Sequence, residues 1–150
     1  MKILIISDSH RNKEIIREVI KTDKFDKVIH CGDSGLKLKE LKGIYAVRGN
    51  CDFDQKIPEE IVTVIDNKKF FISHGHKYNV KYELDRLYQK AEEISADVVC
   101  FGHTHYLGYE IINDILFINP GSLTRGRGFM KNTYAVLDTT DLSVKIYKIE

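Results

Sequence analysis

The chain has 150 residues and a mass of 17.3 kDa, which suits one domain with a substantial hydrophobic core, so we expect residues 1–150 to form a single domain. With 43% hydrophobic and 30% charged residues, its composition is that of a soluble globular protein and excludes wholesale disorder. The formal net charge is only +1, so no global electric field favours nucleic acid or an acidic membrane as a partner.

The apolar start MKILII is too short for a secretory signal or a membrane span, and no other stretch approaches the ~20 apolar residues that a membrane helix needs. The three cysteines, Cys31, Cys51 and Cys100, are odd in number and lack a Cys-x-x-Cys spacing. This pattern disfavours a disulfide framework or a zinc ribbon. We therefore expect a cytoplasmic protein that makes no membrane contact.

The first part of the chain alternates strand-like runs with one helix. KILIIS at 2–7 is apolar without alternation, which is typical of a strand buried on both faces. Asn12 is a candidate N-cap for a helix over 12–22, whose apolar residues fall on one face. Further strands are predicted in DKVIHCGD at 26–33 and IYAVRGN at 44–50. The order strand, helix, strand, strand is the beginning of a parallel α/β sheet.

The rest of the chain is rich in strands. IVTVI and KFFIS flank Asp66-Asn67-Lys68 as a hairpin, and a helix is predicted over 82–95. The remaining predicted strands are DVVCFG at 97–102, a hairpin formed by 109–112 and 115–119, and the pair 133–138 and 143–149. Two packed sheets with helices on the outside would reconcile the two halves.

Five of the predicted strands deliver polar side chains to their carboxyl ends, usually beside a glycine. These residues are Asp8 and His10, Asp33, Asn50 and Asp52, His74 and His76, and His103 and His105. In open α/β sheets this edge binds ligands, and glycine lets the backbone turn sharply there. The mixed set of carboxylate, amide and imidazole suits Mn, Fe, Co, Ni or Zn better than Ca or Mg. Two carboxylates, one amide oxygen and four imidazoles from this list would make seven ligands, too many for one tetrahedral ion and about right for two ions that share a bridge.

Each motif alone has an ordinary explanation. Asp-x-His and Gly-Asp are common turn chemistry, and an isolated histidine is more often on the surface than a ligand. Gly-His-x-His at 102–105 is more specific, because two imidazoles flanking one residue rarely serve packing. All five motifs at strand ends in this order favour a functional site.

The order Asp-x-His, Gly-Asp, Gly-Asn, His, Gly-His-x-His resembles that of the calcineurin-like metallophosphoesterase superfamily. The forms HCGD and RGNCD and the segment INPGSLTRGRG are more similar to its small single-domain phosphodiesterase branch of bacteria and archaea. The resemblance spans Asp8 to Arg127. It implies an α/β fold, a four-layer α/β/β/α sandwich of two mixed sheets with flanking helices, and a two-metal centre at the strand ends.

The resemblance also implies roles for single residues. Asp8, His10 and His105 would hold the first metal, Asn50, His74 and His103 the second, and Asp33 would bridge both, together with a shared water or hydroxide. Two ions ~3.5–4 Å apart lower the pKa of that water and stabilise an in-line displacement at phosphorus. Mn is the preferred metal, with Ni, Fe, Zn, Co and Mg as alternatives.

One position departs from the family pattern. Many members carry a histidine where this chain has Cys51, and that histidine donates a proton to the leaving group. A free thiol has a pKa of about 8.5 and is a poor acid near neutral pH, so release of poor alkoxide leaving groups should be slow. His76 could supply the proton instead, or it could simply face solvent. Together with Asn50 and His74, Cys51 and His76 are the candidate catalytic residues.

The segment NPGSLTRGRG contains the candidate substrate-binding residues Asn119, Ser122, Arg125 and Arg127. The two arginines could hold a phosphate bidentately, and the alternative is a mobile, basic glycine-rich loop. Three residues are assigned to the core: His30 as a hydrogen-bonded histidine, and Cys31 and Cys100 as small hydrophobes.

The leading hypothesis is a metal-dependent hydrolase of a small phosphodiester with a shallow, open site. The alternative is a scaffold without catalysis, since the metallophosphoesterase-like subunit of the eukaryotic retromer coat resembles this chain in size. That subunit does not retain the full ligand set, whereas all seven positions are filled here, which favours the enzyme. A nuclease acting on polymers is disfavoured by the near-zero net charge. Exposed strands near the carboxyl terminus could pair in a homodimer.

Overall fold

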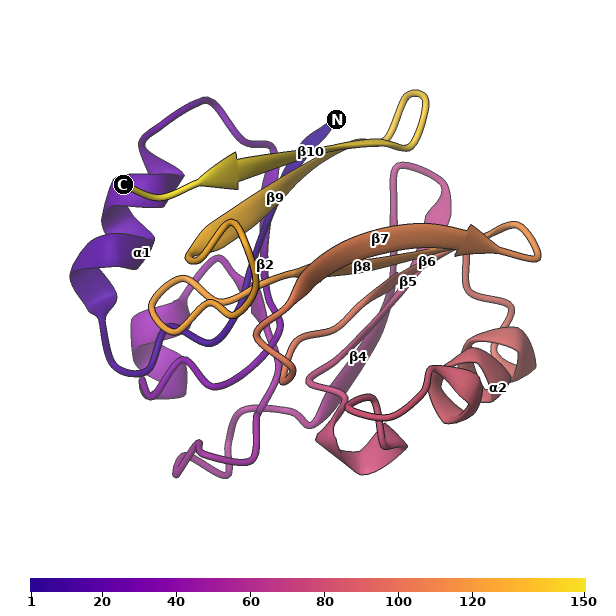
Figure 1. The fold of residues 1–150 in the computed structure, drawn as a ribbon, viewed down its shortest axis with the longest axis horizontal. Helices are drawn as coiled ribbons and strands as arrows, with labels where there is room; N and C mark the ends of the chain where they lie inside the picture. The colour runs from indigo at the N-terminus through magenta and orange to yellow at the C-terminus, as the bar shows by residue number, and fades with distance from the viewer.

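The computed structural model describes all residues, 1–150, and its strands form two five-stranded sheets (Figure 1). The first sheet has the order β10-β9-β1-β2-β3, with β1 at Lys2–Ile6, β2 at Lys27–His30, β3 at Tyr45–Ala46, β9 at Thr133–Asp138 and β10 at Ser143–Lys148. The second has the order β4-β5-β6-β8-β7, with β4 at Glu60–Ile65, β5 at Lys68–Ser73, β6 at Val98–Cys100, β7 at Leu107–Ile112 and β8 at Ile115–Pro120. Both sheets mix parallel and antiparallel pairs.

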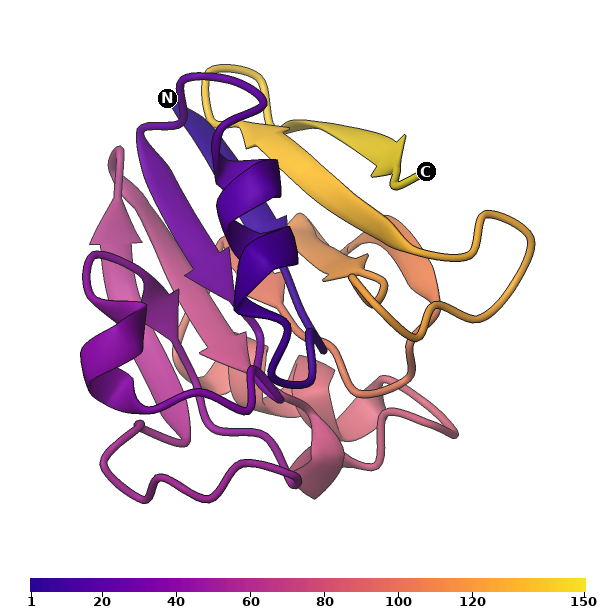
Figure 2. The same cartoon turned by 90° about the vertical axis from the view of Figure 1, so that its left-hand side faces the viewer.

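The helices cover the outer faces of the sheets, so the molecule has four layers (Figures 1 and 2). In α1 (Lys13–Ile20), Ile16 and Val19 pack in one cluster with Leu4 of β1. In α2 (Asp85–Glu93), the buried helical residues pack against strands of the second sheet. Alternate residues of a strand point to opposite faces, so the remaining apolar side chains meet between the sheets. Members of this central cluster include Ile3, Ile5, Ile29, Phe70, Ile72, Val98 and Ile118. The predicted α/β/β/α sandwich is confirmed.

The structure corrects the predicted bounds of the second helix. It begins at Asp85 rather than at residue 82, and Leu84 at its N-cap provides no capping side chain. The N–H groups of Tyr82 and Glu83 donate instead to the carbonyl of Asn79. At the other end Ser95 has a φ of 57°, which stops the helix. Two short 3-10 helices, Leu38–Leu41 and His76–Tyr78, were not predicted.

The predicted N-cap of the first helix and the predicted hairpin turn between β4 and β5 are confirmed. The Asn12 side chain accepts a hydrogen bond from the N–H of Ile15 at 3.1 Å and caps α1. Asp66 and Asn67, which join β4 to β5, have φ values of 50° and 63°. Both values suit a tight hairpin turn that matches the twist of its strands.

Loops that follow strands of both sheets meet at one edge of the sandwich. The His74 ring, after β5, lies 2.7 Å from the carbonyl of Cys31, after β2. The N–H of His103, after β6, donates to the carboxylate of Asp8, after β1, at 3.2 Å. The carboxyl ends of these four strands therefore frame one site. None of the helices is long and apolar enough to cross a membrane.

Candidate metal centre

The Asp8 carboxylate lies at the middle of this edge and is fully buried. Its Oδ2 accepts hydrogen bonds from the Ser7 hydroxyl and the His103 N–H. Its Oδ1 makes no hydrogen bond, although His105 Nε2 is 3.3 Å away. Burial alone would raise the pKa of Asp8, but His105, His74 and Ser7 outweigh it and lower this pKa below its usual value. An ionised, buried carboxylate with a free oxygen is a group that needs a cation.

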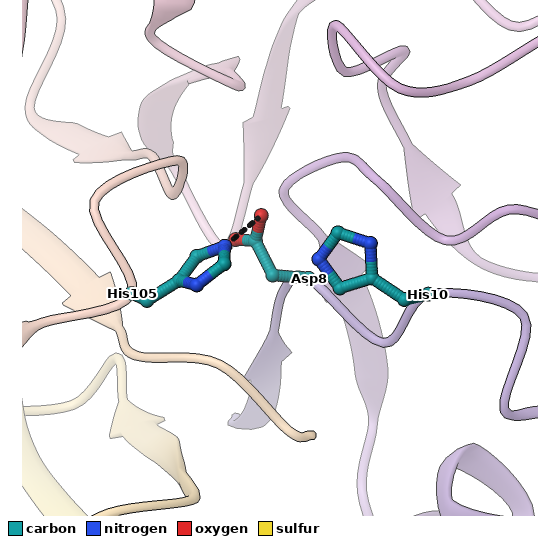
Figure 3. A group of neighbouring side chains, drawn as sticks. All are labelled: Asp8, His10 and His105. Atoms are coloured by element: carbon teal, nitrogen blue, oxygen red, sulfur yellow. Dashed lines mark ion pairs between the residues drawn. The ribbon is translucent and has the colours of Figure 1, made fainter. Parts of the chain in front are cut away.

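Asp8, His10 and His105 form a first cluster, whose ligand atoms all lie within 4.8 Å of one another. Figure 3 shows the Asp8 carboxylate between two imidazoles that come from different loops. The ring centroids of His10 and His105 are 5.6 Å apart. His10 Nε2 is also buried without a hydrogen-bond partner. Two buried, unpartnered polar atoms in one cluster, an anionic oxygen and a ring nitrogen, fit a divalent metal ion.

Asp8 also belongs to a second cluster, with Asp33 and His74. His74 Nδ1 lies 2.7 Å from the Cys31 carbonyl oxygen and donates its proton there. In a neutral ring, Nε2 then has only a lone pair, yet it lies 3.2 Å from Asp33 Oδ2 and 3.1 Å from Asn50 Oδ1. A proton or a cation must therefore lie between Nε2 and these two oxygens. A metal-binding histidine typically donates its other N–H to a backbone carbonyl in this way.

The charges of this second cluster support the same conclusion. Burial opposes the protonation of His74, but the hydrogen bond to Asp33 and the charge of Asp8 outweigh it and raise the pKa of His74. Burial likewise opposes the ionisation of Asp33, but His74 and the N–H of Cys51 hold the pKa of Asp33 below its usual value. Both carboxylates are therefore anionic and attract a positive charge.

The His103 ring stands beside this cluster, with its centroid 5.1 Å from that of His74. Burial, with a contribution from the neighbouring His74, lowers the pKa of His103 to about 4. The ring is therefore neutral at physiological pH and has a nitrogen lone pair to offer. The structure thus brings all seven predicted ligands to one edge.

One predicted role differs from the arrangement of the clusters. The resemblance makes Asp33 the bridging ligand, whereas Asp8 is the carboxylate that the two clusters share. Asp33 Oδ2 faces His74, whereas Asp33 Oδ1 accepts the N–H of Cys51. The bridging role of Asp33 stays a prediction.

Five of the predicted ligands have left-handed backbone conformations. Asp8, His10, Asp33, His103 and His105 have φ values between 44° and 72°. Such conformations cost non-glycine residues on the order of 1–3 kcal/mol each and concentrate at functional sites. They turn the chain sharply after each strand, so that the side chains of these residues face one another at the edge of the sandwich.

Glycines allow the close packing around the two carboxylates. A Cβ at Gly49 would lie 2.0 Å from Asp33 Oδ1, and one at Gly102 would lie 2.7 Å from Asp8 Oδ2. Neither glycine has a positive φ, so both are needed for space rather than for conformation.

Asp52 has a supporting role that the sequence analysis missed. Its carboxylate accepts the N–H groups of Asp33, Gly35 and Gly49 at 2.9, 2.8 and 2.7 Å. It therefore ties the loop after β2 to the loop after β3, which carries Asn50. A carboxylate three residues after a glycine, in the turn that follows a strand, is the signal that could have indicated this supporting role.

His30 is a core histidine, as predicted. Its Nδ1 accepts the N–H of Gly32 at 3.1 Å, so Nε2 carries the proton and donates to Ser9 Oγ at 2.9 Å. Burial lowers the pKa of His30 to about 4, which keeps the ring neutral. Cys31 and Cys100 are fully buried in the core, also as predicted.

Cys51 lies at the rim of the site and is exposed. Partial desolvation and the negative charge of Asp33 raise the pKa of its thiol, so it stays protonated at neutral pH. His76 also lies beside the metal ligands, with its ring centroid 5.3 Å from that of His74 and its Nδ1 buried without a partner. The catalytic roles assigned to these two residues stay predictions.

The four predicted substrate-binding residues divide into two kinds. Asn119 is buried and donates to the Gly102 carbonyl, and Ser122 is buried and donates to the Asp8 carbonyl, so both brace the ligand loops. Arg125 is exposed and lines a cavity of about 330 Å³ together with His10, Asp33 and Cys51. Arg127 is linked to the site through its backbone N–H, which donates to the His105 carbonyl. Their contacts with substrate stay predictions.

Comparisons with known proteins agree with this geometry. The model of the calcineurin-like phosphoesterase superfamily domain matches residues 1–142. The chain is 40% identical to the probable metallophosphoesterase YsnB of Bacillus subtilis, over 91% of this chain and 83% of that protein. It is 34% identical to the phosphodiesterase MJ0936 of Methanocaldococcus jannaschii, over 93% of each.

A solved structure shows the same fold. The crystal structure of a predicted phosphoesterase from Streptococcus pneumoniae superimposes with a TM-score of 0.92 and 33% identity, covering 98% of this chain and 88% of that one. The family match over almost the whole chain, the identity to two curated relatives and the buried Asp and His clusters lead to one assignment: the chain belongs to the calcineurin-like phosphoesterase superfamily.

Proposed function

We propose that the chain is a phosphodiesterase that depends on two divalent metal ions and hydrolyses a small phosphodiester. The observation that carries this proposal is the pair of buried Asp and His clusters in which Asp8 Oδ1 and His10 Nε2 lack any hydrogen-bond partner. The phosphodiesterase name of a relative 34% identical to the chain supports the substrate class.

Each residue has a definite task in this proposal. Asp8, His10 and His105 would hold one ion, Asn50, His74 and His103 would hold the other, and Asp33 would be shared by both. Bound divalent ions would polarise the phosphoryl oxygens and lower the pKa of coordinated water. The chain itself supplies rigidity, because the Cys31 carbonyl orients His74 and Asp52 anchors the backbone of Asp33. A preorganised site of this kind spends little energy on reorganisation during the reaction.

The site has no strong acid to protonate the leaving group. The thiol pKa of Cys51 is raised, and burial together with the neighbouring His74 lowers the pKa of His76, so His76 is neutral near pH 7. Neither group is a strong acid at neutral pH. We therefore expect esters with good leaving groups to react fastest.

The test compares hydrolysis of bis-p-nitrophenyl phosphate and p-nitrophenyl phosphate with Mn²⁺, Ni²⁺, Mg²⁺ or no metal. We expect metal-dependent turnover that favours the diester, and its loss in Asp33→Ala. The matched control is Asp85→Ala, which removes an exposed carboxylate from the start of α2. The absence of metal-dependent turnover, or full activity in Asp33→Ala, would overturn the proposal in favour of a scaffold without catalysis.

A further inference from the structure

A second cavity adjoins the cavity at the metal cluster. The first, of about 330 Å³, is lined by His10, Asp33 and Arg125, and the second, of about 510 Å³, by Lys37 and Lys56. Both are also lined by the same three residues, Arg11, Gly35 and Phe53. The two cavities therefore lie side by side and are together called the basic groove, of which the second cavity is the part without metal ligands.

The charges along the basic groove are mainly positive. Its four cations are Arg125, Arg11, Lys37 and Lys56, and none of them takes part in an ion pair. Nearby cations do find partners, since Lys13 pairs with Glu40 at 3.2 Å. Four unpaired cations in one groove attract an anion and fit its oxygens.

The two carboxylates of the groove do not cancel this charge. Asp33 belongs to the metal cluster. Both oxygens of Asp54 accept backbone hydrogen bonds, from Leu38 at 2.8 Å and from Lys56 at 3.0 Å. In the second cavity, Lys37 and Lys56, with Arg11 at its border with the first, therefore outnumber the single carboxylate of Asp54.

Phe53 provides the apolar surface between the two ends. Its side chain is 81% exposed, and the Arg11 guanidinium lies 5.7 Å from the centre of its ring. This cation–π contact places Arg11 at the junction of the two cavities. An exposed aromatic face beside cations is suited to a sugar or base that joins two phosphates.

We propose that the substrate is a phosphodiester with a second phosphate group on the same molecule. The diester phosphorus lies at the metal cluster, the connecting sugar or base covers Phe53, and the second phosphate binds Arg11, Lys37 and Lys56. This inference rests on the proposed function and narrows its substrate class to small, nucleotide-like diesters.

The test measures kcat/KM with Mn²⁺ for thymidine 5′-(p-nitrophenyl phosphate) and for the same ester with an added 3′-phosphate. Charge-assisted hydrogen bonds favour the second ester, and we expect its kcat/KM to be about tenfold higher, mainly through a lower KM. Because the contacts are exposed, this advantage should shrink as salt is added.

Variants test whether Lys37 and Lys56 cause the higher kcat/KM of the 3′-phosphorylated ester. In Lys37→Ala/Lys56→Ala the ratio of the two kcat/KM values should fall toward one. The matched control, Lys24→Ala/Lys42→Ala, removes the same charge from exposed positions outside the groove and should keep the wild-type ratio. Circular dichroism of both double variants verifies that they are folded.

The outcomes separate this inference from the function on which it rests. If the wild type hydrolyses the unphosphorylated ester but the ratio is near one, or if the ratio survives in Lys37→Ala/Lys56→Ala, the second-phosphate site is refuted and the phosphodiesterase proposal stands. If neither thymidine ester nor bis-p-nitrophenyl phosphate is hydrolysed with any metal, the phosphodiesterase proposal fails as well.

Discussion

Gly49 is the residue at which a single methyl group would disturb the metal cluster most directly. In Gly49→Ala the new Cβ would lie 2.0 Å from Asp33 Oδ1 and 2.6 Å from the Asp33 nitrogen, so the carboxylate must move. A displacement of about 1 Å in a catalytic group can cost about 100-fold in rate, and we expect a loss of this size in metal-dependent kcat/KM for bis-p-nitrophenyl phosphate.

The control for this prediction is Gly108→Ala. A Cβ at Gly108 would meet nothing within 4 Å, and Gly108 has no positive φ. The activity of Gly108→Ala should therefore stay at the wild-type value. Thermal unfolding of both variants distinguishes a local shift of Asp33 from a loss of folded protein. A folded Gly49→Ala with undiminished activity would contradict the role given to Asp33.

His30 makes stability depend on pH. Its pKa is about 4 in the folded protein and about 6.5 in an unfolded chain, because burial disfavours the charged ring. The unfolded state therefore binds more protons between these values, so the contribution of His30 is complete above pH 6.5 and is lost as the pH falls toward 4.

The variant that tests this effect is His30→Gln, which does not titrate. The free energy of unfolding of the wild type relative to that of His30→Gln should fall by about 3 kcal/mol between pH 7 and pH 4. Urea denaturation in the presence of EDTA, at several pH values, measures this difference. A difference that is independent of pH would show that His30 keeps an ordinary pKa.

At the scale of single elements, α1 is held at its start by Asn12, two residues after His10. The Asn12 side chain satisfies the N–H of Ile15, and Asn12→Ala should cost about 1 kcal/mol of unfolding free energy. Asn12→Asp keeps an oxygen acceptor and serves as the control, with a loss of only a few tenths of a kcal/mol. Urea denaturation compares the two, and equal losses would show that the cap contributes nothing.

The elements themselves were largely predictable from the sequence. Uninterrupted apolar runs identify the buried strands, and the Asp66-Asn67 signal identifies a hairpin, because these patterns depend on residues that are close in the chain. The start of α2 was not predictable in this way. It depends on Asn79, whose carbonyl accepts two N–H groups and whose φ is 59°. Neither feature appears in the hydrophobic periodicity of the sequence.

The sequence predicted which residues meet at this edge, and it did not predict their geometry. Strand ends beside glycines identify the candidate ligands, because parallel strands bring their carboxyl ends together. The hydrogen bond between the N–H of His103 and Asp8 joins residues 95 positions apart, and the three N–H groups bound by Asp52 come from two loops. Such contacts follow from how the sheets pack, which no local pattern encodes.

At the scale of the whole molecule, the site lies where the two sheets meet. Asp8, His10 and Asp33 follow strands of the first sheet, while His74 and His103 follow strands of the second. The His74 ring already contacts the Cys31 carbonyl across this junction. Bound metal would therefore connect both halves of the sandwich and should stabilise the fold as a unit.

Metal binding should accordingly raise the melting temperature of the whole chain. A ligand that binds only the folded state at 100 times its dissociation constant adds about 2.7 kcal/mol, which corresponds to roughly 5–10 °C for a chain of this size. Thermal unfolding of EDTA-treated protein with increasing Mn²⁺ measures the shift. We expect a smaller shift in Asp33→Ala and the full shift in Asp85→Ala.

The shape of this transition is as informative as its midpoint. Because ligands come from both sheets, Mn²⁺ should move one cooperative transition upward rather than split it into two. A second transition that ignores Mn²⁺ would mean that one sheet unfolds without releasing metal, in conflict with ligands shared across the junction. A melting temperature unchanged by Mn²⁺ would contradict the metal centre itself, since Asp8 Oδ1 and His10 Nε2 would then stay buried without any partner.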